Sequence, residues 1–162
     1  MQSAVPAHRR LVHHYRQDIE AAPDRVFPLI CPVREAEWLA GWHYAMLYSQ
    51  SGLAEAGAVF STPGRGEPDT TWVITRHDAT ARIVQFTRFT PDLRTCVLDV
   101  HITPAAAGRS FVEITYTYTA LSAEGEAFLA ALTREKFLAG VMFWEQSMNH
   151  WLRTGQQLQP GS

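Results

Sequence analysis

The stretch that most constrains how this chain can fold is residues 122–154, SAEGEAFLAALTREKFLAGVMFWEQSMNHWLRT. Ser122 is a good N-cap, Arg153 places positive charge in the last turn, and Gly155 offers a left-handed stop. No proline interrupts the stretch. The pattern predicts one long helix, and at 1.5 Å per residue it would reach roughly 48 Å.

The second half of this helix carries one apolar stripe with spacings of three and four residues: Phe137, Val141, Trp144, Met148 and Trp151 or Leu152. The opposite side is expected to face solvent and carries Glu135, Glu145, Asn149 and Arg153. Phe128, Leu129 and Leu132 point well away from the stripe. We therefore expect a bend or a change of packing partner near residues 133–136.

The sequence before the helix supplies strands on which the stripe can lie. A strand is predicted from His8 to Ile19, and two short helices follow, at residues 24–31 and from Pro32 onward. About six antiparallel strands are predicted between His43 and Thr119. In residues 71–90 the alternation leaves open which face is buried, since Ile83 and Phe89 are alternatives to Trp72, Ile74 and Phe86.

The last two strands allow a specific register to be predicted. One apolar set is Cys96, Leu98, Val100 and Ile102, and the other is Val112, Ile114, Tyr116 and Tyr118. Setting Ile102 opposite Val112 pairs the remaining members in order, down to Cys96 opposite Tyr118. The same register puts His101 opposite Glu113 on the outer face, so His101 is interpreted as a surface residue.

Composition excludes several functional classes. The chain has 162 residues, 46% hydrophobic and 19% charged, with a net charge of -2, which is typical of a single globular domain and gives no indication of nucleic-acid binding. No run of about 18 apolar residues and no signal-like segment occurs, so a cytoplasmic protein without membrane insertion is expected. Cys31 and Cys96 are interpreted as buried, reduced thiols. We expect no metal and no cofactor, because no ligand set, GxSxG, HExxH, CxxC or phosphate-binding loop is present.

A single antiparallel sheet needs one face covered, and the C-terminal helix is the element long and apolar enough to do so. This order of elements, with AAPDRVFPLICPVREAEWLAGW, MLYSQSG and TYTYTALSAEG, resembles the START/Bet v 1-like helix-grip superfamily (SRPBCC, polyketide cyclase-like), and within it a bacterial subgroup. The resemblance spans about Val12 to Leu152. It implies an α+β domain over residues 1–162 with an ordered core at about 8–155. In it, a curved antiparallel sheet of about seven strands wraps around the long helix, with two short helices after the first strand.

In such a fold a ligand would lie between the sheet and the long helix. The predicted ligand-binding residues are Trp72, Ile74, Phe86, Leu98, Val100, Tyr116, Tyr118, Phe137, Val141, Trp144 and Met148; Tyr44, Met46 and Tyr48 are weaker candidates. For each of them, simple core packing is the alternative. Arg76 and Arg88 are in phase with the inward residues and are candidate polar anchors for a carboxylate or phenolate, although exposure at the strand ends is the favoured alternative for both. Glu35 is interpreted as a helix-surface acid, with a position at the cavity entrance as the alternative.

Three functions follow as hypotheses. The first is binding of a small or medium hydrophobic molecule, and the second is a cyclase or dehydratase acting on an aromatic or polyketide substrate, as the resemblance implies. The third is a protein-interaction module with a filled cavity, in which Trp38, Trp42 and the loop at residues 63–69 would form the working surface. A homodimer is compatible with each of them.

Overall fold

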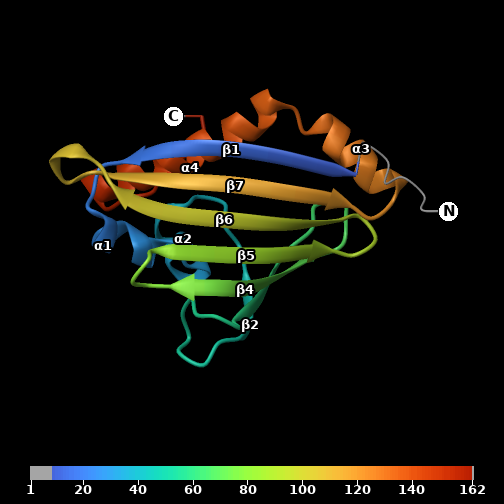
Figure 1. Cartoon of the computed structure of the whole chain (residues 1–162), viewed down its shortest axis with the longest axis horizontal. Helices are drawn as coiled ribbons and strands as arrows, with labels where there is room; N and C mark the ends of the chain where they lie inside the picture. Colours follow the sequence, from blue (N-terminus) through green and yellow to red (C-terminus); the bar gives the residue numbers. More distant parts are fainter. Residues whose placement is uncertain (1–8, 162) are drawn as a thin grey trace.

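The computed structural model describes residues 9–161, and the helices and strands follow the predicted order (Figure 1). The predicted start of the first strand and of the ordered core at His8 lies outside the described residues. None of the described helices combines the length and the apolarity that crossing a membrane requires. The elements are β1 (Arg10–Ile19), α1 (Pro23–Val26), η1 (Phe27–Leu29), α2 (Pro32–Trp38), β2 (Ala45–Tyr48), β3 (Val59–Thr62), β4 (Thr70–Asp78), β5 (Ile83–Thr90), β6 (Arg94–Pro104), η2 (Ala106–Gly108), β7 (Ser110–Ala120), α3 (Ala123–Ala131) and α4 (Arg134–Thr154).

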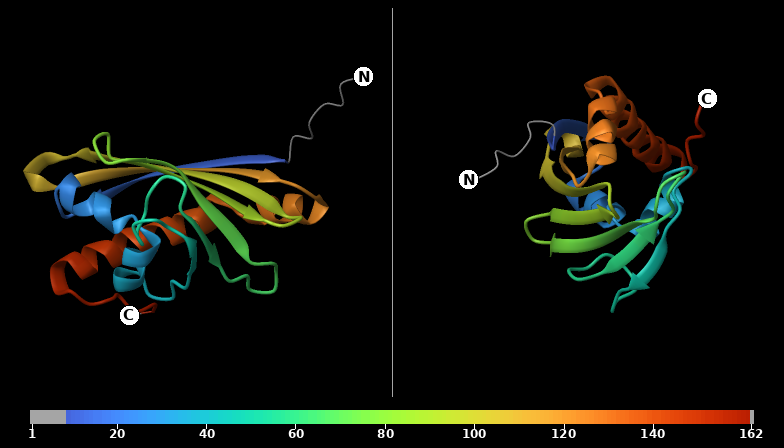
Figure 2. Two further views of the ribbon diagram at one scale, coloured as in Figure 1. Left: turned by 90° about the horizontal axis from the view of Figure 1, so that it is seen from below. Right: turned by 90° about the vertical axis from the view of Figure 1, so that its right-hand side faces the viewer.

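The strands form one antiparallel sheet of seven strands in the order β1-β7-β6-β5-β4-β3-β2. The sheet curves, and α1, α2 and α4 lie together on its concave side (Figure 2). Buried side chains from the inner face of the sheet and from these helices make up the main core. The predicted α+β helix-grip architecture is therefore confirmed.

The predicted register of the last two strands is confirmed residue by residue. Ile102 lies opposite Val112, Leu98 opposite Tyr116, and the remaining apolar pairs fall between and beyond them as predicted. His101 pairs with Glu113 and is exposed, as expected. This register works because every second side chain of a strand faces the same way, so an apolar set on each strand permits one alignment.

One irregularity in β4 changes which residues face the core. Ile74 lies opposite Phe86, but Arg76 lies opposite Gln85, so the register shifts between them at a β-bulge. Trp72, Ile74 and Phe86 are buried, whereas Phe89 is exposed, which settles the open question of the inner face. The prediction that Arg76 is in phase with the inward residues was wrong, because the extra residue turns its side chain outward.

The predicted single C-terminal helix is in fact two helices. α3 ends at Ala131, and α4 begins after Thr133, whose hydroxyl oxygen accepts a hydrogen bond from the Lys136 N–H at 3.2 Å. The break lies next to the expected bend. The expected change of packing partner is confirmed, because Leu129 belongs to a second apolar cluster with Cys96, Tyr118 and Ala120.

The side of α4 that was expected to face solvent is docked on the edge strand β1. The Glu145 carboxylate accepts hydrogen bonds from the Tyr15 hydroxyl at 2.9 Å and the Asp18 N–H at 2.5 Å. Asn149 accepts from the Glu20 N–H and donates to the Asp18 carbonyl. The prediction holds for Glu135 and Arg153, which are exposed, and was wrong for Glu145 and Asn149. These two side chains bind backbone groups of β1, which is an edge strand of the sheet within residues 9–161.

Candidate functional site

A cavity of about 350 Å³ lies between the inner face of the sheet and α4. We call it the main cavity. α2 and the segment that follows it form one wall, the strands β3 to β7 form the floor, and α4 forms the other wall. Its lining residues are Glu35, Leu39, Ala40, Gly41, Trp42, Phe60, Trp72, Phe86, Arg88, Leu98, Tyr116, Gly140, Phe143 and Trp144.

The floor of the main cavity is a cluster of aromatic rings in fixed orientations. Trp72 stacks on Phe60 with ring centres 5.2 Å apart and meets the edges of Phe86 at 5.9 Å and Trp42 at 6.0 Å. The indole N–H groups are satisfied outside the cavity, since Trp72 donates to the Thr62 hydroxyl and Trp42 to the Pro32 carbonyl, both at 2.9 Å. These rings therefore offer an apolar surface of mutually packed faces and edges.

Arg88 of β5 is the cation in the lining of the main cavity. Its Nη2 donates to the Tyr118 hydroxyl at 2.9 Å, and its Cζ lies 4.8 Å from the centre of the Trp72 ring and 5.4 Å from that of Tyr116. Stacking on aromatic faces and one fixed hydrogen bond hold the guanidinium in place. Burial raises the pKa of the Tyr116 and Tyr118 hydroxyls, which the nearby Arg88 partly offsets, so both stay neutral hydrogen-bonding groups.

A second hollow of about 220 Å³, the side cavity, lies on the other side of Arg88. The two cavities share Arg88, Tyr116, Gly140 and Trp144. The side cavity is further lined by Tyr118, Leu132, Lys136, Phe137 and Val141. Arg88 therefore borders both the main cavity and the side cavity. Lys136, which lines the side cavity, is also positively charged.

Glu35 of α2 faces the main cavity from the wall opposite the sheet. Among residues 9–161, no side chain forms a hydrogen bond or an ion pair with its carboxyl group. Desolvation by the surrounding protein raises the pKa of this carboxyl to about 8. Glu35 is therefore mainly protonated at neutral pH and can donate a hydrogen bond. The interpretation of Glu35 as a surface acid was wrong, because α2 turns this residue under the sheet.

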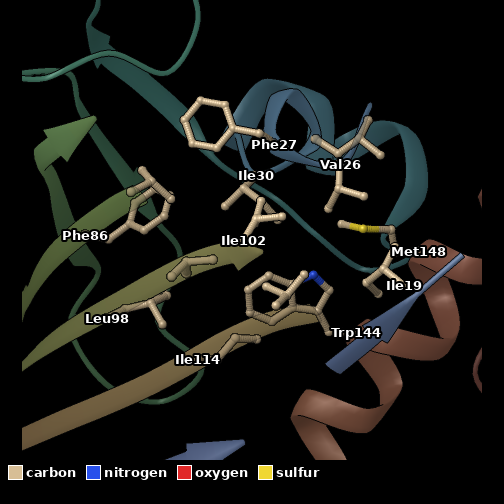
Figure 3. Packing of buried hydrophobic residues seen from close by; sticks show 14 of the residues in the cluster. Ile19, Val26, Phe27, Ile30, Phe86, Leu98, Ile102, Ile114, Trp144 and Met148 are labelled. Atoms are coloured by element: carbon tan, nitrogen blue, oxygen red, sulfur yellow. The ribbon is translucent and has the colours of Figure 1, made fainter. Parts of the chain in front are cut away.

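Trp144 and Met148 occupy consecutive turns of α4 but play different parts. Trp144 lines both cavities and stacks on Trp38 with ring centres 6.3 Å apart. In Figure 3 the nitrogen-bearing edge of its indole is turned toward Met148, away from Phe86 and Leu98, and among the described residues this buried N–H has no hydrogen-bond partner. Met148 is fully buried in the core and lines neither cavity.

The structure brings together six of the predicted site residues in the main cavity: Trp72, Phe86, Arg88, Leu98, Tyr116 and Trp144. Three more line the side cavity, namely Tyr118, Phe137 and Val141. Ile74, Val100 and Met148 lie in the core and line neither space, and Arg76 is exposed and paired with Asp78. Tyr44 and Met46 pack against the core from the edge, whereas Tyr48 is exposed.

Sequence reasoning missed several lining residues. Phe60 lies opposite Trp72 and is buried between half-buried neighbours in β3. β3 has only four residues, too few for the alternation of buried and half-buried side chains to be recognised in the sequence. Gly140 and Phe143 lie beside the predicted stripe of α4, and residues 39–42 belong to a loop without periodicity. The periodic spacing of apolar residues therefore does not identify Gly140, Phe143 or residues 39–42 as lining residues.

The residues expected to form an external interaction surface do not all lie outside. Trp38 is fully buried, and its indole donates to the Leu29 carbonyl at 3.1 Å. Arg94 anchors the loop at residues 63–69 through Glu67, at 2.5 Å. Cys31 and Cys96 are buried and unbridged, as expected. No group of three or more His, Cys, Asp or Glu side chains suited to a metal ion occurs within the described chain.

Known structures with the same arrangement of sheet and helix decide the fold family. Norcoclaurine synthase from Thalictrum flavum superposes with a TM-score of 0.65 at 13% identity, covering 95% of each chain. An aromatase/cyclase from a Streptomyces species gives 0.63 at 12% identity, covering 92% of this chain and 99% of the other. A major latex-like protein from Panax ginseng gives 0.64 at 12%, covering 88% and 97%. The chain has the START/Bet v 1-like helix-grip fold. No protein-family model matches this helix-grip sequence, and no curated protein sequence does so either.

Proposed function

We propose that this helix-grip protein binds a small hydrophobic molecule with an aromatic body in the main cavity. The observation that carries the proposal is the 350 Å³ space walled by Trp42, Phe60, Trp72, Phe86 and Trp144, with few polar groups in its lining. Its volume lies within the range of about 300–1,000 Å³ that is usual for small-molecule sites, and it corresponds to the lower end. A ligand of one or two fused rings is therefore favoured over a long lipid chain.

The similar structures support this reading at the level of the fold. Norcoclaurine synthase has been solved with dopamine and hydroxybenzaldehyde, two small aromatic molecules. At 13% identity that comparison supports the fold alone, and it transfers no ligand. The aromatic lining of the present cavity is the independent reason for expecting an aromatic ligand.

Gly140 offers a direct test, because this exposed position of α4 borders both cavities and a Cβ atom added there meets no atom within 4 Å. Gly140→Trp is expected to narrow the site and weaken ligand binding about tenfold or more. Gly140→Ala is the matched control: it should keep the affinity and stabilise the helix by about 1 kcal/mol.

The measurement is native mass spectrometry of the three freshly purified proteins, followed by organic extraction and analysis of any bound molecule. A stoichiometric small-molecule mass in the wild type and in Gly140→Ala that is depleted in Gly140→Trp supports the proposal. Equal occupancy in all three proteins, or an empty wild type that also shows no thermal shift with aromatic compounds, contradicts it.

A second candidate is an enzyme of the cyclase or dehydratase type, and the protonated carboxyl of Glu35 is the observation that favours it. Near neutral pH the ionised fraction of a carboxyl with a pKa of about 8 can take a proton from the carbon next to a carbonyl group, and the protonated carboxyl can return a proton to that carbon; negative charge meanwhile develops on the carbonyl oxygen. Arg88 and Tyr116, in the lining of the same cavity, could stabilise the negative charge that develops on that oxygen.

Enolisation of a two-ring ketone tests this candidate without knowledge of the natural substrate. Incubated with tetralone in deuterated buffer, the wild type is expected to speed exchange of the acidic C–H hydrogens by about 100-fold or more over Glu35→Gln. The exchange is followed by NMR. Equal rates for the two proteins would restrict the function to binding.

A further inference from the structure

The main cavity is lined by one arginine, Arg88, and one acidic residue, Glu35, and the charge states of these two groups indicate which ligands the cavity can bind. Within residues 9–161, seven arginines form ion pairs with carboxylates: Arg9, Arg34, Arg76, Arg82, Arg94, Arg109 and Arg153. Arg88, the one that borders the cavity, is not among them. Glu67 forms its hydrogen bonds with Arg94, and the more distant charge of Arg88 also helps to lower the pKa of that carboxyl.

Arg88 retains hydrogen-bonding capacity for a ligand. A guanidinium has five N–H donors, and the Tyr118 hydroxyl takes one of them. The group is half-buried among the rings of Trp72, Tyr116 and Tyr118, where water screens its charge poorly. An anion placed beside it would form a charge-assisted hydrogen bond of the strong kind.

Among the described residues, Glu35 is the one acidic group in the lining of the main cavity, and no other carboxylate of residues 9–161 borders either cavity. The groups that face it are Arg88 from β5 and Tyr116 from β7; the α4 residues Gly140, Phe143 and Trp144 and the adjoining residues 39–42 contribute no charge. Because Glu35 is mainly protonated and uncharged at neutral pH, the guanidinium of Arg88 gives the main cavity a net positive charge. Lys136 in the side cavity reinforces it.

We propose that the main cavity selects an aromatic ligand that carries one anionic group, held by Arg88, and a second oxygen that accepts a hydrogen bond from Glu35. This inference rests on the proposed function, because it names the class of molecule that the same site takes. The two groups come from different sides of the main cavity, Arg88 from the floor on β5 and Glu35 from the wall on α2, so together they would orient a ring system bound between them. A cationic ligand of the same shape is rejected.

Methoxynaphthoate is a suitable probe, with a carboxylate at one end and an ether oxygen at the other; its methyl ester is the neutral match. Titration calorimetry of the full chain near neutral pH is expected to give about 10- to 100-fold tighter binding of the acid than of the ester. Arg88→Gln should reduce that ratio to about threefold or less. Arg76→Gln, which changes an exposed arginine of β4, is the control and should leave the ratio unchanged.

The pH profile is a second readout, which a purely structural role of Glu35 would not produce. The probe's carboxylate stays ionised from about pH 6 to about pH 9.5. As the Glu35 carboxyl loses its proton near pH 8, binding of the acid should weaken about tenfold or more. Glu35→Gln keeps a neutral donor and should bind the acid with an affinity that does not change over this range.

The outcomes separate the two proposals. If the ester binds as tightly as the acid at neutral pH, the cavity binds aromatic molecules but does not select anions, and this inference fails alone. If neither probe binds, both the inference and the proposed function are contradicted. If Arg88→Gln does not fold, the acid-to-ester ratio of the wild type and the pH profiles of wild type and Glu35→Gln still decide the inference.

Discussion

Replacing Trp144 with alanine is expected to weaken binding of an aromatic ligand about tenfold or more and to lower the free energy of unfolding by about 3–5 kcal/mol. The side chain is 9% exposed, packs against Trp38 and presents its ring to both cavities. Its loss removes buried apolar contact from the core and a flat face from the ligand site at once. Urea unfolding measures the first effect, and titration with methoxynaphthoate ester measures the second.

Met148→Ala is the matched control for Trp144→Ala, since both residues lie on the buried stripe of α4. Met148 is fully buried and borders neither cavity, so its truncation should cost about 2–5 kcal/mol of stability while leaving the affinity unchanged. Comparing the two variants therefore separates an effect on folding stability, expected for both, from an effect on ligand affinity, expected for Trp144→Ala alone. Equal affinities for wild type and Trp144→Ala would place the ligand elsewhere.

Glu35→Gln is expected to stabilise the protein at alkaline pH. In the folded state the pKa of Glu35 is raised from 4.5 to about 8, so between these two values the unfolded chain releases a proton that the folded chain retains. Folding stability of the wild type must therefore fall as pH rises from about 4.5 to about 8, and then level off. Glutamine has nearly the same shape and no charge, so the variant escapes this loss.

Allowing for the partial exposure of the side chain, the gain at pH 8 is expected to be about 2–4 kcal/mol, with little difference between variant and wild type near pH 4.5. Urea unfolding at a series of pH values measures it. Glu37→Gln is the control, because Glu37 lies on the same helix, is exposed and pairs with Arg34 at the surface. A constant difference between Glu35→Gln and wild type at all pH values would mean that Glu35 is an ordinary ionised carboxylate.

The two arginines that the sequence placed in phase with the inner face show where pattern reasoning succeeds and where it stops. Arg88 lies where the alternation of β5 predicts, because β5 pairs regularly with β6 from end to end. Arg76 follows a bulge in β4 and is exposed. An inserted residue reverses every later side chain in a strand, and no residue type marks its position in this sequence.

The two ends of α4 give a similar contrast. Its buried stripe was predicted correctly at Phe137, Val141, Trp144 and Met148, since apolar spacing of three and four residues is a local property. At the other end, the change of packing partner near residues 133–136 was also predicted, from the apolar residues that leave the stripe, but a complete break between two helices was not, because neither glycine nor proline marks the junction. The break arises because the two helices pack on different apolar clusters.

The sequence by itself determined the order of elements, the inner faces of the regular strands and the register of β6 and β7, because burial of one face repeats with a period that can be read along the chain. Only the tertiary structure decided that Glu35 faces a cavity, that its carboxyl holds a proton at neutral pH, and that Arg88 lacks a carboxylate partner. These properties depend on which groups from α2, β5 and α4 meet across the space between sheet and helix. The free energy of a charge is set by its surroundings in three dimensions, and residue order does not specify them.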